Sequence, residues 1–433
     1  MEKLALRIAS ILARYAVSIP SSRMNEQTPP PLQAGDTAWL LTSAALVLLM
    51  VFGLSLFYGG MVRRKNVLST FMHSFVALPV ISLLWFFVGH SLVFGKTHGG
   101  LIGGTEFFAF RSLYGSNNQT TPSLAFASYQ MMFAAITPAL ISGAIAERIR
   151  FTTYVVYITL WSLLVYVPVA HWVWGTGGWL SELHALDFAG GAVIHVTAGS
   201  AALVAALMVG KRLKYPQERP TPHNLTMTLL GAGILWFGWF GFNAGSALKA
   251  SPLAALAFAN THLAACGGAL AWLVVEWKHR GKPTALGVAS GLVAGLVGIT
   301  PAAGFVAPWA APIIGGVTSA LCYAAVVKKD RFGYDDSLDA FGVHGVGGFV
   351  GALLTGVFAE VRMNEAGADG LLFGNFKLVG IQLLTCLVAA VYSGGMTWVL
   401  LKVLALRMEL RVAPNDEREG LDTTQHGESA YNG

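Results

Sequence analysis

The sequence predicts an all-α membrane protein with eleven transmembrane helices. The chain has 433 residues, of which 55% are hydrophobic and only 12% are charged, and long apolar runs recur along most of it. A helix needs about 20 largely apolar residues to cross a bilayer. The 50 glycines are typical of lipid-embedded bundles, in which small residues let helices approach closely. Because Cys266, Cys322 and Cys386 all lie in apolar runs, we expect neither a disulfide framework nor a thiolate metal site.

The apolar runs define the expected spans. Basic residues are concentrated in every second loop, after spans 1, 3, 5, 7 and 9. Because cytoplasmic loops carry the excess of Lys and Arg, we expect the N-terminus outside and the C-terminus in the cytoplasm. The predicted spans are residues 37–62, 67–94, 123–147, 151–173, 188–209, 225–249, 252–277, 284–305, 306–327, 339–358 and 377–406.

We place the membrane domain at residues 36–406, and one segment flanks it on each side. Residues 1–35 resemble a secretory signal weakly, since Arg7 and Arg14 interrupt its apolar region, and a translation start at Met24 is an equally good interpretation. Residues 407–433 are polar and acidic and form the expected cytoplasmic tail.

Internal similarity divides the membrane domain into two halves. FGLSLFYGG at residues 52–60 resembles FGWFGFNAG at residues 237–245, and ITPA occurs at 136–139 and again at 299–302. Spans 1–5 and 6–10 therefore look like two copies of one unit. Because five is an odd number, the copies have opposite directions in the membrane. Inverted repeats of this kind place a substrate site near the midplane, where the copies meet.

Each half contains an Asp followed eight residues later by a His. The pairs are Asp187 with His195 and Asp336 with His344. Eight helical residues extend about 12 Å from opposite sides of a core about 30 Å thick, which leaves about 6 Å between the histidines along the membrane normal. An ionisable side chain inside a span is costly and marks a functional site by default. The matched depth indicates a site at the centre of a membrane pathway, and the separation is compatible with direct contact between the two imidazoles.

The rival interpretations of these residues are structural or metal-binding. Zinc usually takes at least three protein ligands, and each Asp is expected about 12 Å from its own His. For Asp336, N-terminal capping of the helix is the favoured role. For Asp187 we expect a mixed role, in which the outer carboxylate also attracts cations.

A second group of residues is expected near the outer surface. Trp239, Phe242 and Ser246 are spaced i, i+3 and i+7 and so share one helix face. Trp174 ends span 4 on the same side, and Phe133 lies somewhat deeper in span 3. Aromatic faces attract cations. Aromatic belts also mark every membrane interface, and spacing alone favours that ordinary interpretation.

Several motifs give the chain a family resemblance. Residues 36–433 resemble the ammonium transporter (Amt/Rh) family, and three of the motifs match its bacterial Amt branch. The family motifs are DFAGGAVIH (187–195), WFGFNAGS (239–246) and FGVHGVGG (341–348), and the branch motifs are AERIRF (146–151), GKPTALG (281–287) and EREGLDTTQHGESAY (417–431).

The resemblance implies a homotrimer with one pore in each subunit and residue roles within that pore. His195 and His344 resemble the paired pore histidines, and Trp239 resembles a pore-lining Trp. Phe133, Trp174 and Ser246 resemble the outer ammonium recruitment site, beside which we place Asp187. Tyr129 and Phe242 resemble the stacked aromatic gate, although its first position is often Phe. The tail implies regulation by a PII-type signalling protein.

Together these observations predict ammonium transport across the inner cell membrane, with no enzyme activity and no cofactor, metal or nucleic acid. Ammonium would be recruited and deprotonated at the outer side, and ammonia would pass the histidines. Whether the proton follows is left open by the sequence. The alternatives are an ammonium sensor with incidental flux and a membrane enzyme. The sequence disfavours the enzyme because no nucleophile, metal set or phosphate loop accompanies the histidines.

Overall fold

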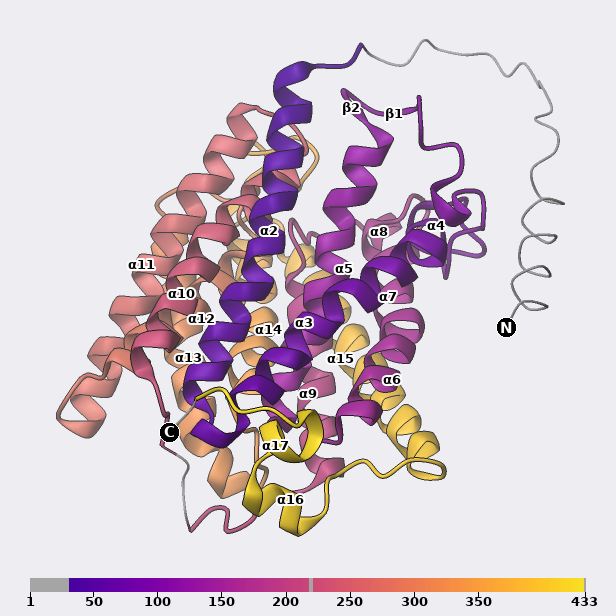
Figure 1. Cartoon of the computed structure of the whole chain (residues 1–433). Coiled ribbons are helices and arrows are strands. Elements are labelled where there is room, and N and C mark those ends of the chain that lie inside the picture. Colours follow the sequence, from indigo (N-terminus) through magenta and orange to yellow (C-terminus); the bar gives the residue numbers. More distant parts are fainter. Residues whose placement is uncertain (1–30, 218–220, 432–433) are drawn as a thin grey trace, which may run out of the picture. The chain divides into compact units, whose positions relative to one another are not determined.

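The computed structural model describes residues 31–217 and 221–431, and the first thirty residues of the expected N-terminal segment lie outside this described part. The first half of the fold contains five helical stretches long and apolar enough to span a membrane, and π and 3-10 turns interrupt several of them (Figure 1). Its elements are α2 (Ala34–Met61), η1 (Arg64–Asn66), α3 (Val67–Leu84), η2 (Trp85–Gly89), α4 (His90–Phe94), η3 (Phe108–Phe110), β1 (Asn117–Asn118), β2 (Thr121–Pro122), α5 (Ser123–Ile145), α6 (Phe151–Trp161), η4 (Ser162–Tyr166), α7 (Val167–Trp174), α8 (Trp179–Glu182), η5 (Gly191–Val196) and α9 (Thr197–Val209).

The second half follows the same plan and ends in a folded tail. The antiparallel pair of β1 and β2 is the only sheet in the described residues. The remaining elements are α10 (Leu225–Trp239), η6 (Phe240–Ala244), η7 (Gly245–Ala247), α11 (Pro252–Arg280), α12 (Ala285–Ile299), α13 (Ala311–Phe332), η8 (Phe341–Gly345), α14 (Val346–Phe358), η9 (Leu371–Phe373), α15 (Phe376–Ala405), α16 (Pro414–Glu419) and α17 (Leu421–His426).

The helices confirm the predicted all-α membrane fold. Ten helical stretches in the described residues are long and apolar enough to span a membrane, and α12 is a shorter apolar helix. The ninth predicted span is displaced: it was expected at 306–327, but α13 begins at Ala311. The eighth stops early, at Ile299. Pro301 explains the difference, because proline has no amide hydrogen to continue the helical ladder.

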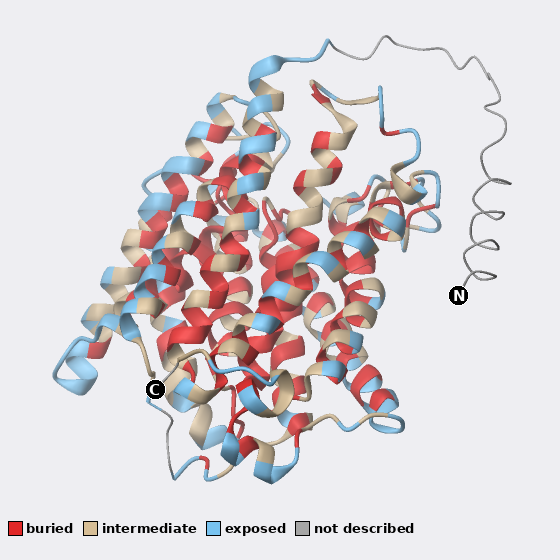
Figure 2. Ribbon diagram, in the orientation of Figure 1, coloured by how far each residue is buried: buried red, intermediate tan, exposed pale blue. Residues whose placement is uncertain are grey.

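The two halves meet through glycines at the centre of the bundle. A Cβ on Gly199 would lie 2.2 Å from the Cα of Gly345, and a Cβ on Gly348 would lie 2.7 Å from the carbonyl oxygen of Gly191. Only glycine permits these close approaches, which bring η5 and α9 against η8 and α14. The α9 stretch is also strongly buried: 72% of it is buried, against 33% for the α11 stretch. Figure 2 shows the buried residues filling the middle of the bundle.

Candidate functional site

His195 and His344 are in direct contact, with which the Asp–His spacings in the sequence are compatible. Their Nδ1 atoms are 3.2 Å apart, and their rings are nearly parallel, with centroids separated by 5.2 Å at 13°. A hydrogen bond between two Nδ1 atoms requires one to donate and the other to accept. The neutral pair therefore holds opposite tautomers, so one ring has a bare Nε2 and the other an Nε2–H. The Nε2 atom of His195 is buried and has no protein partner.

Both histidines lie in π-helical turns, η5 and η8. Such turns are rare and are frequent at functional sites. Each turn is preceded by its Asp. The carboxylate of Asp187 accepts hydrogen bonds from the amides of Gly190, Gly191, Ala192 and Val193.

Asp336 plays the matching part in the other half. Its carboxylate accepts hydrogen bonds from the amides of Ala340, Phe341 and Gly342. Both carboxylates therefore cap the segments that carry the histidines. The cap contacts fit the structural role expected for Asp336. They also show that the carboxylate of Asp187, a residue that is only 7% exposed, accepts hydrogen bonds from backbone amides.

Trp239 forms the wall beside His195. Its indole stacks on the imidazole at 5.6 Å and 21°. The indole N–H donates to the hydroxyl of Thr300 at 3.0 Å, and that hydroxyl donates to the carbonyl of Leu296. Thr300 was not singled out from the sequence. It belongs to the second ITPA repeat, which signalled similarity between the halves but gave no role for its hydroxyl.

A cavity of about 10 Å³ lies next to the paired histidines. This volume is close to the minimum that holds one water-sized molecule, about 10–15 Å³. Apart from the two imidazoles and the Trp239 indole, its lining is apolar. The lining residues are Met50, Leu54, Phe57, Ile136, Leu140, Ile194, His195, Leu235, Trp239, Phe242, Val293 and His344.

Two stacked phenylalanine rings lie beside this cavity, and one of them, Phe242, lines it. Phe133 and Phe242 are parallel within 13°, with centroids 4.3 Å apart, and Phe242 is 6.1 Å from the ring of His195. The stacked pair differs from the expected one, Tyr129 with Phe242. Tyr129 meets Phe133 at a 58° tilt, because its hydroxyl is drawn to the backbone of Phe242, 2.8 Å away.

The remaining residues of the outer group lie around this pair. Trp174 is edge-on to Phe133, with ring centroids 6.3 Å apart, and its indole N–H donates to the carbonyl of Asp187 at 2.9 Å. Asp187 thus orients Trp174 through its backbone. The Ser246 hydroxyl donates to the carbonyl of Phe242 at 2.9 Å. The structure brings the expected aromatic and hydroxyl groups together above the histidines.

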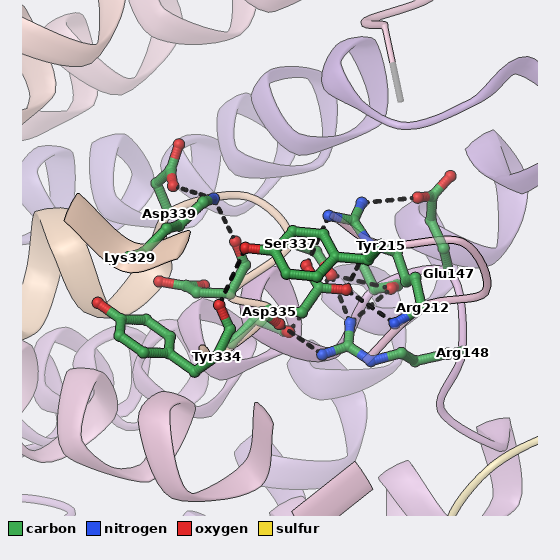
Figure 3. Close-up of polar contacts among 12 residues, drawn as sticks. Glu147, Arg148, Arg212, Tyr215, Lys329, Tyr334, Asp335, Ser337 and Asp339 are labelled. Carbon is green, nitrogen blue, oxygen red and sulfur yellow. Dashed lines mark hydrogen bonds and ion pairs between the residues drawn. The ribbon is translucent and has the colours of Figure 1, made fainter. Parts of the chain in front are cut away.

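A buried ion-pair network that the sequence did not predict joins residues of three loops (Figure 3). Arg212 donates to Glu147 at 2.9 Å and to both carboxylate oxygens of Asp335, at 2.7 and 2.9 Å. Burial favours the neutral acids, but nearby guanidinium groups outweigh it and hold the pKa of both acids below the ordinary values. Arg212 contributes most to each, with Arg63 beside Glu147 and Arg148 beside Asp335. Arg148 donates to the carbonyl of Asp335 at 2.6 Å, and burial lowers its pKa to about 10.

The tail docks on this network. Glu417 of α16 accepts hydrogen bonds from the amide of Leu213 at 2.7 Å and from Arg411 at 2.6 Å. Asp422 of α17 accepts from the amide of Ser69 at 2.8 Å. Figure 1 shows α16 and α17 at the end of the bundle opposite to β1 and β2. The tail is thus connected to Arg212 through the adjacent residue.

The fold and the site define a class: a multi-pass helical membrane protein with a small, largely apolar cavity beside two buried imidazoles. The model of the Ammonium Transporter Family matches residues 38–431. The chain is 48% identical to an ammonium transporter of Bacillus subtilis, over 92% of this chain and 99% of the relative. It is 49% identical to one of Aquifex aeolicus, over 93% of this chain and 94% of the relative.

Solved structures agree with these relatives. Saccharomyces cerevisiae Mep2 superposes with a TM-score of 0.83 at 40% identity and covers 91% of this chain and 92% of its own. A structure described as a sensor Amt protein has a TM-score of 0.85 at 33% identity, over 90% and 98% of the two chains. The chain belongs to the ammonium transporter family, and it is a membrane transport protein rather than an enzyme.

Proposed function

We propose that ammonium is recruited at Phe133, Trp174 and Ser246, loses a proton, and crosses as ammonia past His195 and His344. The observation that carries this proposal is the paired imidazoles beside a cavity of about 10 Å³. Ammonia is both a donor and an acceptor. The opposite tautomers required by the Nδ1 contact offer it one Nε2 acceptor and one Nε2–H donor.

The apolar lining supports selectivity against potassium. Potassium and ammonium have similar sizes, so a simple cation pore would separate them poorly. A bare ion entering this cavity would lose its hydration without gaining a carboxylate, which is costly. Ammonium avoids that cost because it can leave its charge behind as a proton, whereas potassium cannot. We assign the stacked rings of Phe133 and Phe242 as the gate between the recruitment site and the cavity.

Uptake by purified protein in liposomes tests this function. We expect saturable uptake of labelled methylammonium that ammonium competes away, and a simultaneous current recording shows whether the proton follows. A sensor with incidental flux is the second candidate, and it is favoured by the similarity to the sensor Amt protein. Absence of measurable uptake by well-folded protein would reject transport and leave the sensor.

We also propose that the chain forms a homotrimer. His262 is exposed on the outward face of α11, about the middle of the helix, and stacks on Trp236 with centroids 5.1 Å apart. A polar ring at this depth is expensive in lipid, which supports cover by a second copy. Native mass spectrometry in detergent is the test, and a monomer under all mild conditions would reject the assembly.

The tail supports a proposal for regulation in the cytoplasm. Residues 407–433 would bind a PII-type protein. A movement of the tail on binding would reach Arg212 through the hydrogen bond between Glu417 and the amide of Leu213. Arg212 holds Asp335, the neighbour of the Asp336 cap on the His344 segment. Pull-down with a PII-type protein, with and without nucleotide, is the test. No binding in any nucleotide state, together with unchanged flux after deletion of 407–433, would reject this role.

A further inference from the structure

The hydroxyl of Tyr129 joins the two segments that carry the stacked gate rings. Tyr129 lies one helical turn before Phe133 on α5 and is fully buried. Its Oη atom is 2.8 Å from the carbonyl oxygen of Phe242 and 2.9 Å from that of Gly241. One side chain on the helix of the first ring is therefore bonded to the backbone of the second ring.

The backbone around Phe242 offers this hydroxyl unusual acceptors. The helix changes from α to π at Phe240–Ala244, then to 3-10 at Gly245–Ala247, and ends at Leu248 with a φ of 58°. These changes disturb the regular ladder of hydrogen bonds. The carbonyl of Gly241 also accepts from the Gly245 amide, and that of Phe242 also accepts from the Ser246 hydroxyl. The Tyr129 hydroxyl therefore adds a further donor, and this one ties the segment to α5.

Ser246 belongs to the same hydrogen-bonded group. Its Oγ is 3.2 Å from Tyr129 Oη and donates to the carbonyl of Phe242. The space around the group is tight. A Cβ on Gly245 would come within 2.8 Å of both Tyr129 Oη and the Ser43 Oγ. The hydroxyl of Tyr129 cannot move toward Gly245 without displacing this segment.

We propose that the Tyr129 hydroxyl is a positioning group that holds Phe133 and Phe242 in their stack and thereby makes the path selective for ammonium over larger alkylammonium ions. This inference rests on the proposed function, in which the two rings form the gate. The rings must part for any molecule to pass. A methyl group requires a wider opening than a hydrogen does, so a stiffer gate penalises methylammonium more than ammonium.

The test is Tyr129→Phe, which removes the hydroxyl and keeps the ring. Purified protein in liposomes is assayed for kcat/KM with ammonium and with methylammonium. We expect the methylammonium-to-ammonium ratio to rise by about fivefold, the equivalent of one hydrogen bond of typical net strength. General damage to the fold would lower both values and leave their ratio unchanged.

A matched control is Tyr154→Phe. Tyr154 is another fully buried tyrosine, and its hydroxyl donates to the carbonyl of His73 at 3.0 Å, on a different helix pair. The methylammonium-to-ammonium ratio of kcat/KM in Tyr154→Phe should stay at the wild-type value. A second variant, Gly245→Ala, crowds both the Tyr129 hydroxyl and the Ser43 side chain instead of removing a hydroxyl. It should raise the methylammonium-to-ammonium ratio in the same direction.

The outcomes separate this inference from the function on which it rests. Wild-type uptake with an unchanged ratio in folded Tyr129→Phe would overturn the inference and leave ammonium transport intact. If Tyr129→Phe does not fold, an unchanged ratio in folded Gly245→Ala would overturn it equally. No uptake by the wild-type protein would remove the proposed function itself.

Discussion

The Nδ1 atoms of His195 and His344 lie 3.2 Å apart although the residues are 149 positions apart in the chain. Each histidine comes from one half of the inverted repeat and follows its own capping Asp by eight residues. The contact fixes the two rings relative to each other, so neither can rotate without losing its partner. The hydrogen bond between the two imidazoles therefore lies at the interface between the two halves of the chain.

We predict that Asp187→Ala nearly abolishes uptake and that Asp336→Ala reduces it less. The Asp187 carboxylate holds four amides and its carbonyl holds Trp174, whereas the Asp336 carboxylate holds three amides. Loss of a capping side chain typically costs about 0.5–2 kcal/mol. Uptake and thermal unfolding should be measured on the same preparations.

A third variant, Asp187→Asn, separates the charge of Asp187 from its capping role. An amide keeps one capping oxygen, which can serve two of the four backbone amides, but it turns an NH2 donor toward the other two and removes the charge. We therefore expect it to recover part of the stability and little of the uptake. Equal losses of uptake and stability in Asp187→Ala and Asp336→Ala would mean that both residues are purely structural.

We predict that Thr300→Val lowers ammonium uptake without unfolding the protein. The substitution keeps the shape of the side chain but leaves the Trp239 indole N–H without its acceptor. A buried unpaired donor costs about 1–3 kcal/mol, enough to shift Trp239 away from His195. Thr137→Val, at the matching position of the first ITPA repeat, is the control, since the Thr137 hydroxyl bonds only to the carbonyl of Phe133 on its own helix. Equal uptake in Thr300→Val and wild type would show that the indole needs no anchor.

We predict that Arg212→Ala destabilises the protein strongly at neutral pH. It leaves Glu147 and Asp335 as buried carboxylates without their main partner, and breaking a buried pair costs about 3–5 kcal/mol. Arg150→Ala is the control. Its pair with Glu409 is exposed, with 40% and 70% of the two side chains accessible, and should contribute less than about 1 kcal/mol.

The pH dependence of the same variant has a defined sign. In the wild type the lowered pKa values of Glu147 and Asp335 mean that the network contributes its stability above their unfolded pKa, and loses it as the pH falls through the folded pKa. Without Arg212, Glu147 keeps Arg63 and Asp335 keeps Arg148 nearby, but the largest attraction that opposes burial is lost. The pKa values of the two carboxyls therefore rise, and protonation costs the folded state less. The difference in unfolding temperature between the two proteins should shrink as the pH falls toward about 4. A constant difference would contradict the role of Arg212.

The sequence predicted much of the fold and the centre of the site for identifiable reasons. Long apolar runs define the spans, and matched Asp–His spacings in two inverted halves place His195 against His344. Periodicity cannot distinguish a π turn from an α turn, so η5, η6 and η8 were not expected. The choice of Phe133 rather than Tyr129 as the partner of Phe242 depends on where one hydroxyl finds its acceptors.

The buried ion-pair network around Arg212 could not be predicted for a different reason. Its members come from three loops far apart in the sequence, at Glu147, Arg212 and Asp335, and each residue alone resembles an ordinary loop charge. Only the folded chain shows that all three are buried together. The docking of α16 and α17 likewise depends on backbone amides at Leu213 and Ser69, which no sequence pattern marks.

The most direct test compares ammonium and potassium fluxes in liposomes that contain wild-type protein, His195→Ala or His344→Ala, after circular dichroism and thermal unfolding have shown that both variants are folded. We predict ammonium uptake without potassium flux in the wild type, and loss of that selective uptake in each variant, because either change removes the Nδ1 contact between the rings. Normal ammonium flux with normal selectivity over potassium in both variants would contradict transport along the paired histidines.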